Sequence, residues 1–266
     1  MANGLALALH QPEQTSGCVT EDGTITVDAS GKEVGQMSAL TAVTVTQEVT
    51  DGHGEHFYQL PGDRYVLKNA VTLDPDLWQA ALEKGQQPFS LKAENINQIW
   101  WGMQSGCEPA ALLEGLHVKG YATELDYLTF LKDMPRAADF NPNHGFGGEP
   151  DQDMPGHFEA IYPEPLVAWA KKYAPVSDVS GLTAEKIPTL LQQKKPIVAY
   201  VTVNFETPEW GEYSFGRAMG NNHAVLVDGY FGELLHVSDP IDGRYWLSMD
   251  RFKKAFDARR WAVEIG

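Results

Sequence analysis

The hydrophobic pattern of this chain changes once, near residue 95, and that change limits what the chain can fold into. Before it, short segments rich in β-branched residues lie between turns rich in Gly and Asp, at 24–27, 42–46 and 64–67. After it, helix-like patterns come first and short strand-like patterns come last. The sequence therefore predicts a small β module followed by an α+β domain.

A chain of 266 residues is long enough for one or two domains, and the change of pattern favours two. We assign residues 1–73 to an N-terminal tail and an all-β module, 74–94 to a linker with a short helix at 76–84, and 95–266 to the second domain. For that domain we expect helices at 108–119, 123–134, 164–173 and 183–194, and strands at 197–203, 224–228, 234–238 and 244–247.

Composition excludes several classes of function. The formal net charge of −16 argues against nucleic acid or an anionic membrane surface as a partner. Two cysteines cannot build a disulfide framework, and no C-x-x-C pair indicates a structural zinc site. We expect no metal and no cofactor, because neither ligand clusters nor phosphate-binding glycine loops occur. The apolar run at 5–9 is too short to span a membrane, so we expect no membrane insertion.

Cys107 lies where a loop meets a helix. Pro109 is tolerated only in the first turn of a helix, so the helix must begin within a residue or two of Cys107. The sulfur would then lie at the positive end of the helix dipole, which favours the thiolate over the thiol. This position predicts a cysteine nucleophile.

A cysteine nucleophile needs a base, and the base needs a group that orients it. The late strands supply His223 and Asp239, each eight residues from Phe231. In a symmetric antiparallel hairpin centred on Phe231, the two side chains would lie directly opposite each other, with Cβ atoms roughly 5 Å apart. A slip of one residue would turn one of them to the other face, so this prediction depends on the register.

An amide side chain just before the nucleophile can join its backbone N–H in stabilising the oxyanion of the tetrahedral intermediate. Gln98 and Gln104 compete for this role. We favour Gln98, because a nine-residue separation lets the chain loop back over the start of the helix more easily than a three-residue one. The sequence leaves the choice between them open.

Each of these residues has a simpler explanation. A lone cysteine is more often a small buried hydrophobe, and Cys18, in the expected N-terminal tail, keeps that interpretation. His236 and His144 are rival bases that we rank below His223. Trp100 and Trp101 are as well explained by packing as by substrate binding.

Several segments together resemble the C39-like cysteine peptidases and span the whole second domain. They are Asn97-Gln98, Ser105-Gly106-Cys107-Glu108-Pro109-Ala110-Ala111-Leu112, the loop at 141–149, Asn222-His223-Ala224-Val225 and Ser238-Asp239-Pro240. The resemblance implies a papain-like fold with Cys107 as nucleophile, His223 as base, Asp239 as orienting residue and Gln98 as oxyanion donor. The N-terminal segments around 56–66 resemble bacterial SH3-like modules over roughly fifty residues.

The sequence thus predicts a thiol hydrolase that cuts a peptide bond in a peptide or protein substrate through an acyl-enzyme. The alternative is a surface binding protein with an SH3-like ligand module and an inactive or acyl-transferring papain-like domain. Free-standing relatives of this type are mostly bacterial envelope or secreted proteins with unassigned substrates. We therefore expect a secreted or envelope-associated location, with a cytoplasmic one left open, and a cell-envelope ligand for the N-terminal module.

Overall fold

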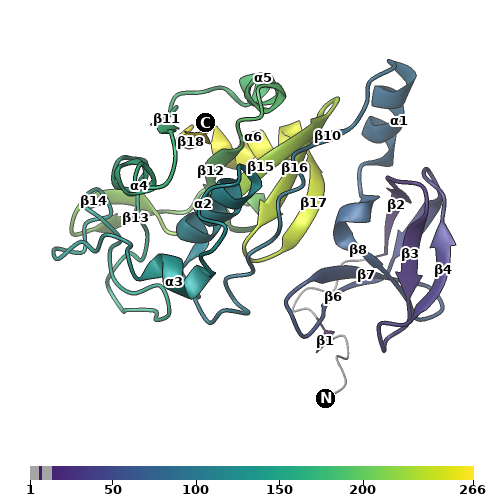
Figure 1. Ribbon diagram of the computed structural model, residues 1–266, viewed down its shortest axis with the longest axis horizontal. Coiled ribbons are helices and arrows are strands. Elements are labelled where there is room, and N and C mark those ends of the chain that lie inside the picture. The colour runs from purple at the N-terminus through teal and green to yellow at the C-terminus, as the bar shows by residue number, and fades with distance from the viewer. Residues whose placement is uncertain (1–5, 8–13) are drawn as a thin grey trace.

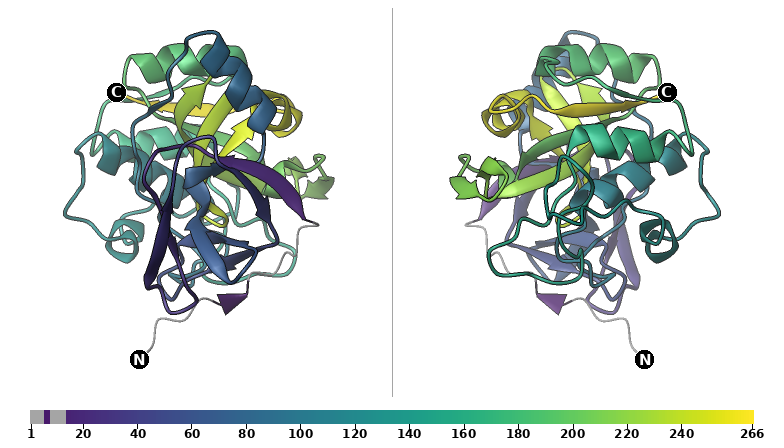
Figure 2. Two further views of the ribbon diagram at one scale, coloured as in Figure 1. Left: turned by 90° about the vertical axis from the view of Figure 1, so that its right-hand side faces the viewer. Right: turned by 90° about the vertical axis from the view of Figure 1, so that its left-hand side faces the viewer.

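The computed structural model describes residues 6–7 and 14–266, and Figure 1 shows an N-terminal β part beside a larger mixed part. The two side views of Figure 2 show these parts one behind the other. The apolar run at 5–9 lies mostly outside the described residues. Within the described ranges, no helix is both long and apolar enough to cross a membrane.

The N-terminal part is all β apart from one turn of 3-10 helix. Its strands form a six-stranded sheet in the order β1-β6-β7-β8-β3-β4 and a three-stranded sheet in the order β5-β2-β9. Strand β7 alternates buried and half-buried residues, as expected for a strand with one face on a core. The elements are β1 (Ala6–Leu7), β2 (Thr15–Val19), β3 (Thr24–Val27), β4 (Glu33–Met37), β5 (Ala42–Val45), β6 (Gln47–Thr50), β7 (His56–Leu60), β8 (Arg64–Leu67), η1 (Lys68–Ala70) and β9 (Val71–Thr72).

The second part is built on a seven-stranded sheet in the order β11-β18-β12-β15-β16-β17, with β10 paired to β15. A separate hairpin joins β13 and β14. The elements are α1 (Pro75–Glu83), β10 (Phe89–Ser90), α2 (Cys107–Val118), α3 (Tyr127–Leu131), α4 (Pro163–Ala170), β11 (Val176–Asp178), η2 (Ala184–Lys186), α5 (Ile187–Gln192), β12 (Ile197–Thr202), η3 (Val203–Phe205), β13 (Trp210–Tyr213), β14 (Gly216–Met219), β15 (Asn222–Phe231), β16 (Leu234–Asp239), β17 (Gly243–Ser248), α6 (Met249–Phe256) and β18 (Ala262–Ile265).

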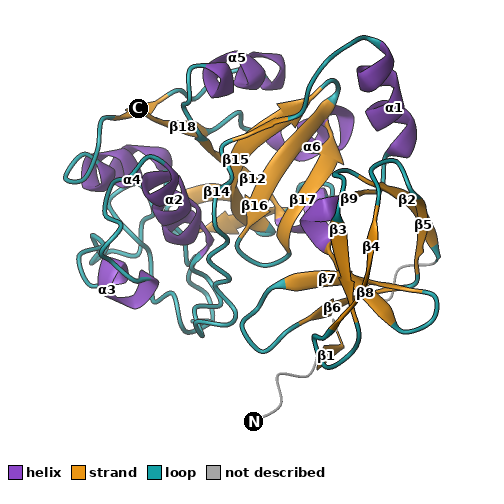
Figure 3. Ribbon diagram, turned by 45° about the vertical axis from the view of Figure 1, so that its right-hand side comes forward, coloured by secondary structure: helices purple, strands orange, loops and turns teal. Residues whose placement is uncertain are grey.

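Strand β15 is buried on both faces because helices cover the sheet on each side (Figure 3). Ala224 and Leu226 belong to a core shared with α2, whereas Val225 and Val227 belong to a core shared with α5 and α6. Helix α2 is buried from Cys107 to Leu116, and Gly115 leaves space for β18, since a Cβ there would lie 2.3 Å from Cδ1 of Ile265. The helix that begins at Cys107 is therefore fixed directly against the strand that carries His223.

Several elements differ from the expected ones for local reasons. The helix expected at 123–134 is only α3, because Asp126 caps it by accepting the N–H of Thr129. The helix expected at 183–194 divides into η2 and α5, and α5 has Pro188 in its first turn, where a proline is tolerated. Cys18 lies in β2 rather than in a tail.

The segment that joins the two parts is packed between them. Helix α1 carries Trp78, which is 2% exposed and makes edge contacts with Phe231 and Trp246 at ring-centre distances of 4.5 and 5.2 Å. Cys18 belongs to the same cluster. A shared apolar core thus joins β2, α1 and the β15–β16 turn.

Candidate active site

Cys107 is the first residue of α2, with Gly106 as the N-cap. The hydroxyl of Tyr127 donates a hydrogen bond to the carbonyl oxygen of Gly106 at 2.6 Å. A Cβ at Gly106 would lie 2.1 Å from that hydroxyl oxygen, so only glycine fits there. The turn that precedes the sulfur is therefore tightly packed.

The sulfur of Cys107 is held as a thiol, contrary to the expected thiolate. The side chain is 6% exposed, and its S–H donates to Oε2 of Glu108 at 3.3 Å. Burial raises the pKa of the Cys107 thiol well above its ordinary value, and the Glu108 carboxylate raises it further. The backbone N–H of Ala224 acts in the opposite direction but is outweighed.

Glu108 connects Cys107 to the strand that bears His223. Its Oε1 accepts a hydrogen bond from Nδ2 of Asn222 at 2.8 Å, and Oδ1 of Asn222 accepts one from Nη2 of Arg259 at 2.6 Å. Glu108 is fully buried, and this burial raises the pKa of its carboxyl. The sequence analysis assigned no role to this residue, although it directly follows Cys107.

Replacing Glu108 by glutamine is expected to speed the alkylation of Cys107 at pH 7 by about tenfold, because losing the carboxylate lowers the pKa of the thiol. The measurement is the second-order rate constant with iodoacetamide in full-length protein. Glu164→Gln, which changes an exposed glutamate in the first turn of α4, should leave the rate unchanged. A slower or unchanged rate in Glu108→Gln would contradict this assignment.

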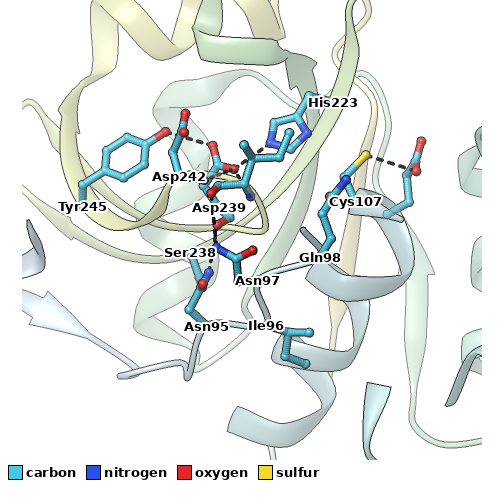
Figure 4. A network of polar contacts seen from close by, with 12 residues as sticks. Asn95, Ile96, Asn97, Gln98, Cys107, His223, Ser238, Asp239, Asp242 and Tyr245 are labelled. Carbon is cyan, nitrogen blue, oxygen red and sulfur yellow. Dashed lines mark hydrogen bonds and ion pairs between the residues drawn. The ribbon is translucent and has the colours of Figure 1, made fainter. Parts of the chain in front are cut away.

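His223 and Asp239 lie in contact, as Figure 4 shows. Nε2 of His223 is 2.8 Å from Oδ1 of Asp239, and both side chains are almost fully buried. Burial alone would lower the pKa of His223, but the Asp239 carboxylate more than offsets it, so the pKa is raised. This contact uses Nε2 and leaves Nδ1 as the nitrogen that can face a thiol.

The hairpin that carries this pair does not have the expected centre. We expected Phe231 to be the midpoint, with His223 directly opposite Asp239. Instead, the last pair before the turn is Phe231 with Leu234, so the midpoint lies one to two residues further along the chain.

A β-bulge at Asp228 accounts for the remaining offset. Beyond the bulge, Leu226 pairs with Ser238. The position on β15 that lies opposite Asp239 is therefore two residues away from His223. A shift of two residues keeps both side chains on one face, as diagonal neighbours within reach of each other. The expected contact therefore forms with a different register.

Asp239 is held by several donors. Its Oδ1 accepts the backbone N–H groups of Ile241 at 2.8 Å and Asp242 at 3.2 Å, and its Oδ2 accepts the hydroxyl of Tyr245 at 3.0 Å. Burial would raise the pKa of Asp239, but His223 and these N–H groups hold it well below its usual range. Asp239 is therefore ionised at neutral pH.

Gln98 is 1% exposed, whereas Gln104 is exposed. One N–H of the Gln98 amide donates to the carbonyl oxygen of Gln104 at 2.7 Å, so the second N–H is not used by that bond. Its Oε1 has no hydrogen-bond partner among the residues that the structure describes. The backbone N–H of Gln98 donates to Pro240 at 2.8 Å, which places Gln98 beside the loop that follows Asp239. This burial and position favour Gln98 over Gln104 as the oxyanion donor.

The rival bases have other partners. Nδ1 of His236 bonds to Oδ1 of the buried Asp228, and Nδ1 of the exposed His144 bonds to Oδ2 of Asp139 at 2.8 Å. Neither contacts Cys107 in the described part of the chain.

Of the four predicted site residues, His223 and Asp239 are hydrogen-bonded to each other. Cys107 is hydrogen-bonded to Glu108 and not to His223. In the view of Figure 4, the sulfur's contact points away from His223.

The long loop after α3 lies beside the segment that leads to Cys107. The backbone N–H of Ser105, two residues before Cys107, donates to the carbonyl oxygen of Pro150 at 2.9 Å. Trp101 packs edge-on against Tyr127, whereas Trp100 is 49% exposed. Trp101 therefore belongs to the core, and Trp100 lies on the surface close to Gln98.

Comparison with known proteins agrees with this fold. The model of the Peptidase_C39 like family matches residues 90–263, and the chain belongs to this family. A crystal structure of a Bacillus anthracis protein assigned as a C39-like peptidase is similar in fold, with a TM-score of 0.58 and 22% sequence identity. The similarity covers 68% of this chain and 98% of that one. No curated protein matches this chain in sequence.

Proposed function

We propose that the chain is a cysteine peptidase or amidase that cleaves a peptide bond through an acyl-enzyme on Cys107. The observation that carries the proposal is the 2.8 Å contact between His223 and an ionised Asp239, on a strand packed against the helix that begins at Cys107. Membership of the C39-like family supports the same class of reaction. The substrate class proposed is a peptide or protein.

The proposed reaction begins with the transfer of the Cys107 proton to His223, as the sulfur attacks the carbonyl carbon. The carbonyl oxygen takes up the negative charge and accepts hydrogen bonds from the free N–H of Gln98 and the backbone N–H of Cys107. His223 then gives its proton to the departing amine, and the acyl group stays on sulfur. A water molecule, deprotonated by His223, attacks the thioester and releases the acid and the thiol.

This reaction requires the sulfur to leave Glu108 and face His223. Rotation about the Cα–Cβ bond of Cys107 moves the sulfur without moving the helix. Asp239 stabilises the imidazolium that forms, and its contact with Nε2 keeps the ring oriented. Glu108 holds the thiol in the resting state.

Alkylation with iodoacetamide near pH 7 tests the proposal without a known substrate. We expect Cys107 to react about tenfold faster in the wild type than in His223→Ala, because the imidazolium stabilises the thiolate. Mass spectrometry of the labelled peptides separates Cys107 from Cys18. An equal rate in His223→Ala, or labelling only at Cys18, would remove the catalytic claim.

Other parts of the sequence hypothesis stay predictions. They are the SH3-like nature of the N-terminal β part, its cell-envelope ligand, and the secreted or envelope-associated location. Hydrolysis and acyl transfer use the same residues, and product analysis with and without an added amine separates them.

A further inference from the structure

The N-terminal part contacts the loop that follows the proposed orienting carboxylate. Nζ of Lys68 donates to the carbonyl oxygen of Asp242 at 2.9 Å, and Arg244 donates to both carboxylate oxygens of Glu55 at 3.1 and 3.0 Å. At Gly243, which has a φ of +75°, a Cβ would lie 2.8 Å from the ring of His56. The loop after Asp239 is thus packed closely against strand β7 and η1.

Lys68 is the buried cation at this junction. Its side chain is 7% exposed, and its Nζ lies 2.7 Å from Oε1 of Glu48. Nζ also lies over the ring of Tyr245, 4.4 Å from the ring centre. Because the hydroxyl of Tyr245 donates to Asp239, one residue of the second part connects Lys68 to the carboxylate that holds His223.

A second connection runs through His56 and Asn97. Nδ1 of His56 is 2.7 Å from Oε1 of Glu48, and its Nε2 is 3.3 Å from Nδ2 of Asn97. The same Nδ2 donates to the carbonyl oxygen of Gly54 at 3.1 Å and lies 3.4 Å from that of Ile241. Asn97 directly precedes Gln98. The N-terminal part therefore contacts both segments that would supply the oxyanion donor and the orienting carboxylate.

A buried lysine is costly unless it is paired and hydrogen-bonded. Its ammonium group faces Glu48 from β6 and the backbone of Asp242, and it is shielded from solvent by Tyr245. Asp242, whose pKa is raised by burial and by Asp239, is stabilised in its ionised form by Lys68. These contacts hold the segment from Asp239 to Tyr245, which contains the β16–β17 turn, against the N-terminal part.

We propose that the N-terminal β part is a component of the catalytic centre, in which Lys68 is a positioning residue that holds the loop of Asp239 in place for His223. This inference rests on the proposed function. It assigns the N-terminal part a role in the reaction that does not depend on any ligand of its own. Lys68 acts through Asp242 and Tyr245 and does not touch the reacting atoms.

The test compares iodoacetamide alkylation of Cys107 from pH 5 to 9 in full-length Lys68→Met, Glu48→Gln/Lys68→Met and wild type. We expect both variants to react about tenfold more slowly at pH 7, with the rate curve moved to higher pH. The physical reason is that a displaced Asp239 no longer stabilises the His223 imidazolium. The double variant also removes the Glu48 carboxylate, which the single variant leaves without its contact to an ammonium group.

Lys32→Met is the matched control, because Lys32 is an exposed lysine of the same part. Its pH curve should equal that of the wild type. Circular dichroism and thermal unfolding establish that each variant is folded. If Lys68→Met fails to fold, the double variant decides the question, and failure of both would overturn a specific positioning role, because Lys68 would then support the fold as a whole.

A wild-type pH curve in a folded Lys68 variant overturns the inference. That result leaves the proposed function intact, provided that the wild-type rate still depends on His223. If the wild-type rate does not depend on His223, the proposed function itself fails. The two outcomes are distinguishable in one set of measurements.

Discussion

Replacing Cys107 by alanine is expected to lower peptide hydrolysis by about 10,000-fold or more, because no other group in the site can form the acyl-enzyme. The wild type should release new amino groups from an unfolded protein substrate at a measurable rate. The rate in Cys107→Ala should equal the background without protein. Fluorescence detection of primary amines, followed over time, measures both.

The other cysteine provides the control. Cys18 lies in β2 and packs in the apolar cluster with Trp78, so Cys18→Ala changes a small buried side chain without touching the site. Hydrolysis by Cys18→Ala should stay within about twofold of the wild type, since surface or distant packing changes seldom alter a site's chemistry. Hydrolysis that survives in Cys107→Ala would show that the sulfur is not the nucleophile.

Replacing Asp239 by asparagine is expected to slow hydrolysis by up to about 10,000-fold, the size of the effect of the equivalent change in a serine-protease triad. The carboxylate raises the pKa of His223, so its loss lowers that pKa and makes the imidazolium less stable. The thiolate–imidazolium pair is then less populated at neutral pH. Alkylation of Cys107 at pH 7 should slow, and its rate curve should move to higher pH.

Asp139→Asn is the matched control for this change. Asp139 also bonds to a histidine, His144, but this pair is exposed and lies outside the site. Its hydrolysis rate and alkylation curve should equal those of the wild type. A wild-type alkylation curve in a folded Asp239→Asn protein would mean that Asp239 does not act through His223.

Local signals predicted the start of the helix that carries Cys107. Pro109 is compatible only with a first turn, and α2 begins at Cys107. The late strands were predicted for a similar reason, because β12, β15, β16 and β17 are short segments rich in β-branched and aromatic residues. These signals are properties of neighbouring residues, so they can be recognised from the sequence alone.

The register of β15 with β16 could not be predicted from neighbouring residues in this way. It depends on the β-bulge at Asp228. The side chain of Asp228 is hydrogen-bonded to His236 and Ser90. A bulge of this kind follows from contacts between segments far apart in the sequence. The contact of His223 with Asp239 was therefore predicted correctly from a wrong register, because the error was an even number of residues.

The state of the Cys107 thiol could not be predicted from the helix dipole alone. The dipole favours the thiolate, but full burial and the adjacent Glu108 carboxylate have the larger, opposite effect. The contacts of Lys68 were also hidden in the sequence, because this residue lies 177 residues before Tyr245 and 171 residues before Asp239. Only the folded structure brings the three residues together.

The hydrogen bond from Cys107 to Glu108 also affects how well the sulfur withstands an oxidising medium. Peroxides attack the thiolate and not the neutral thiol, and exposure to solvent sets how often they meet it. A sulfur that is protonated, buried and turned toward a carboxylate is a poor target for both reasons. The resting Cys107 is thus protected from sulfenic acid formation, and in the proposed reaction the sulfur becomes vulnerable only when it rotates toward His223.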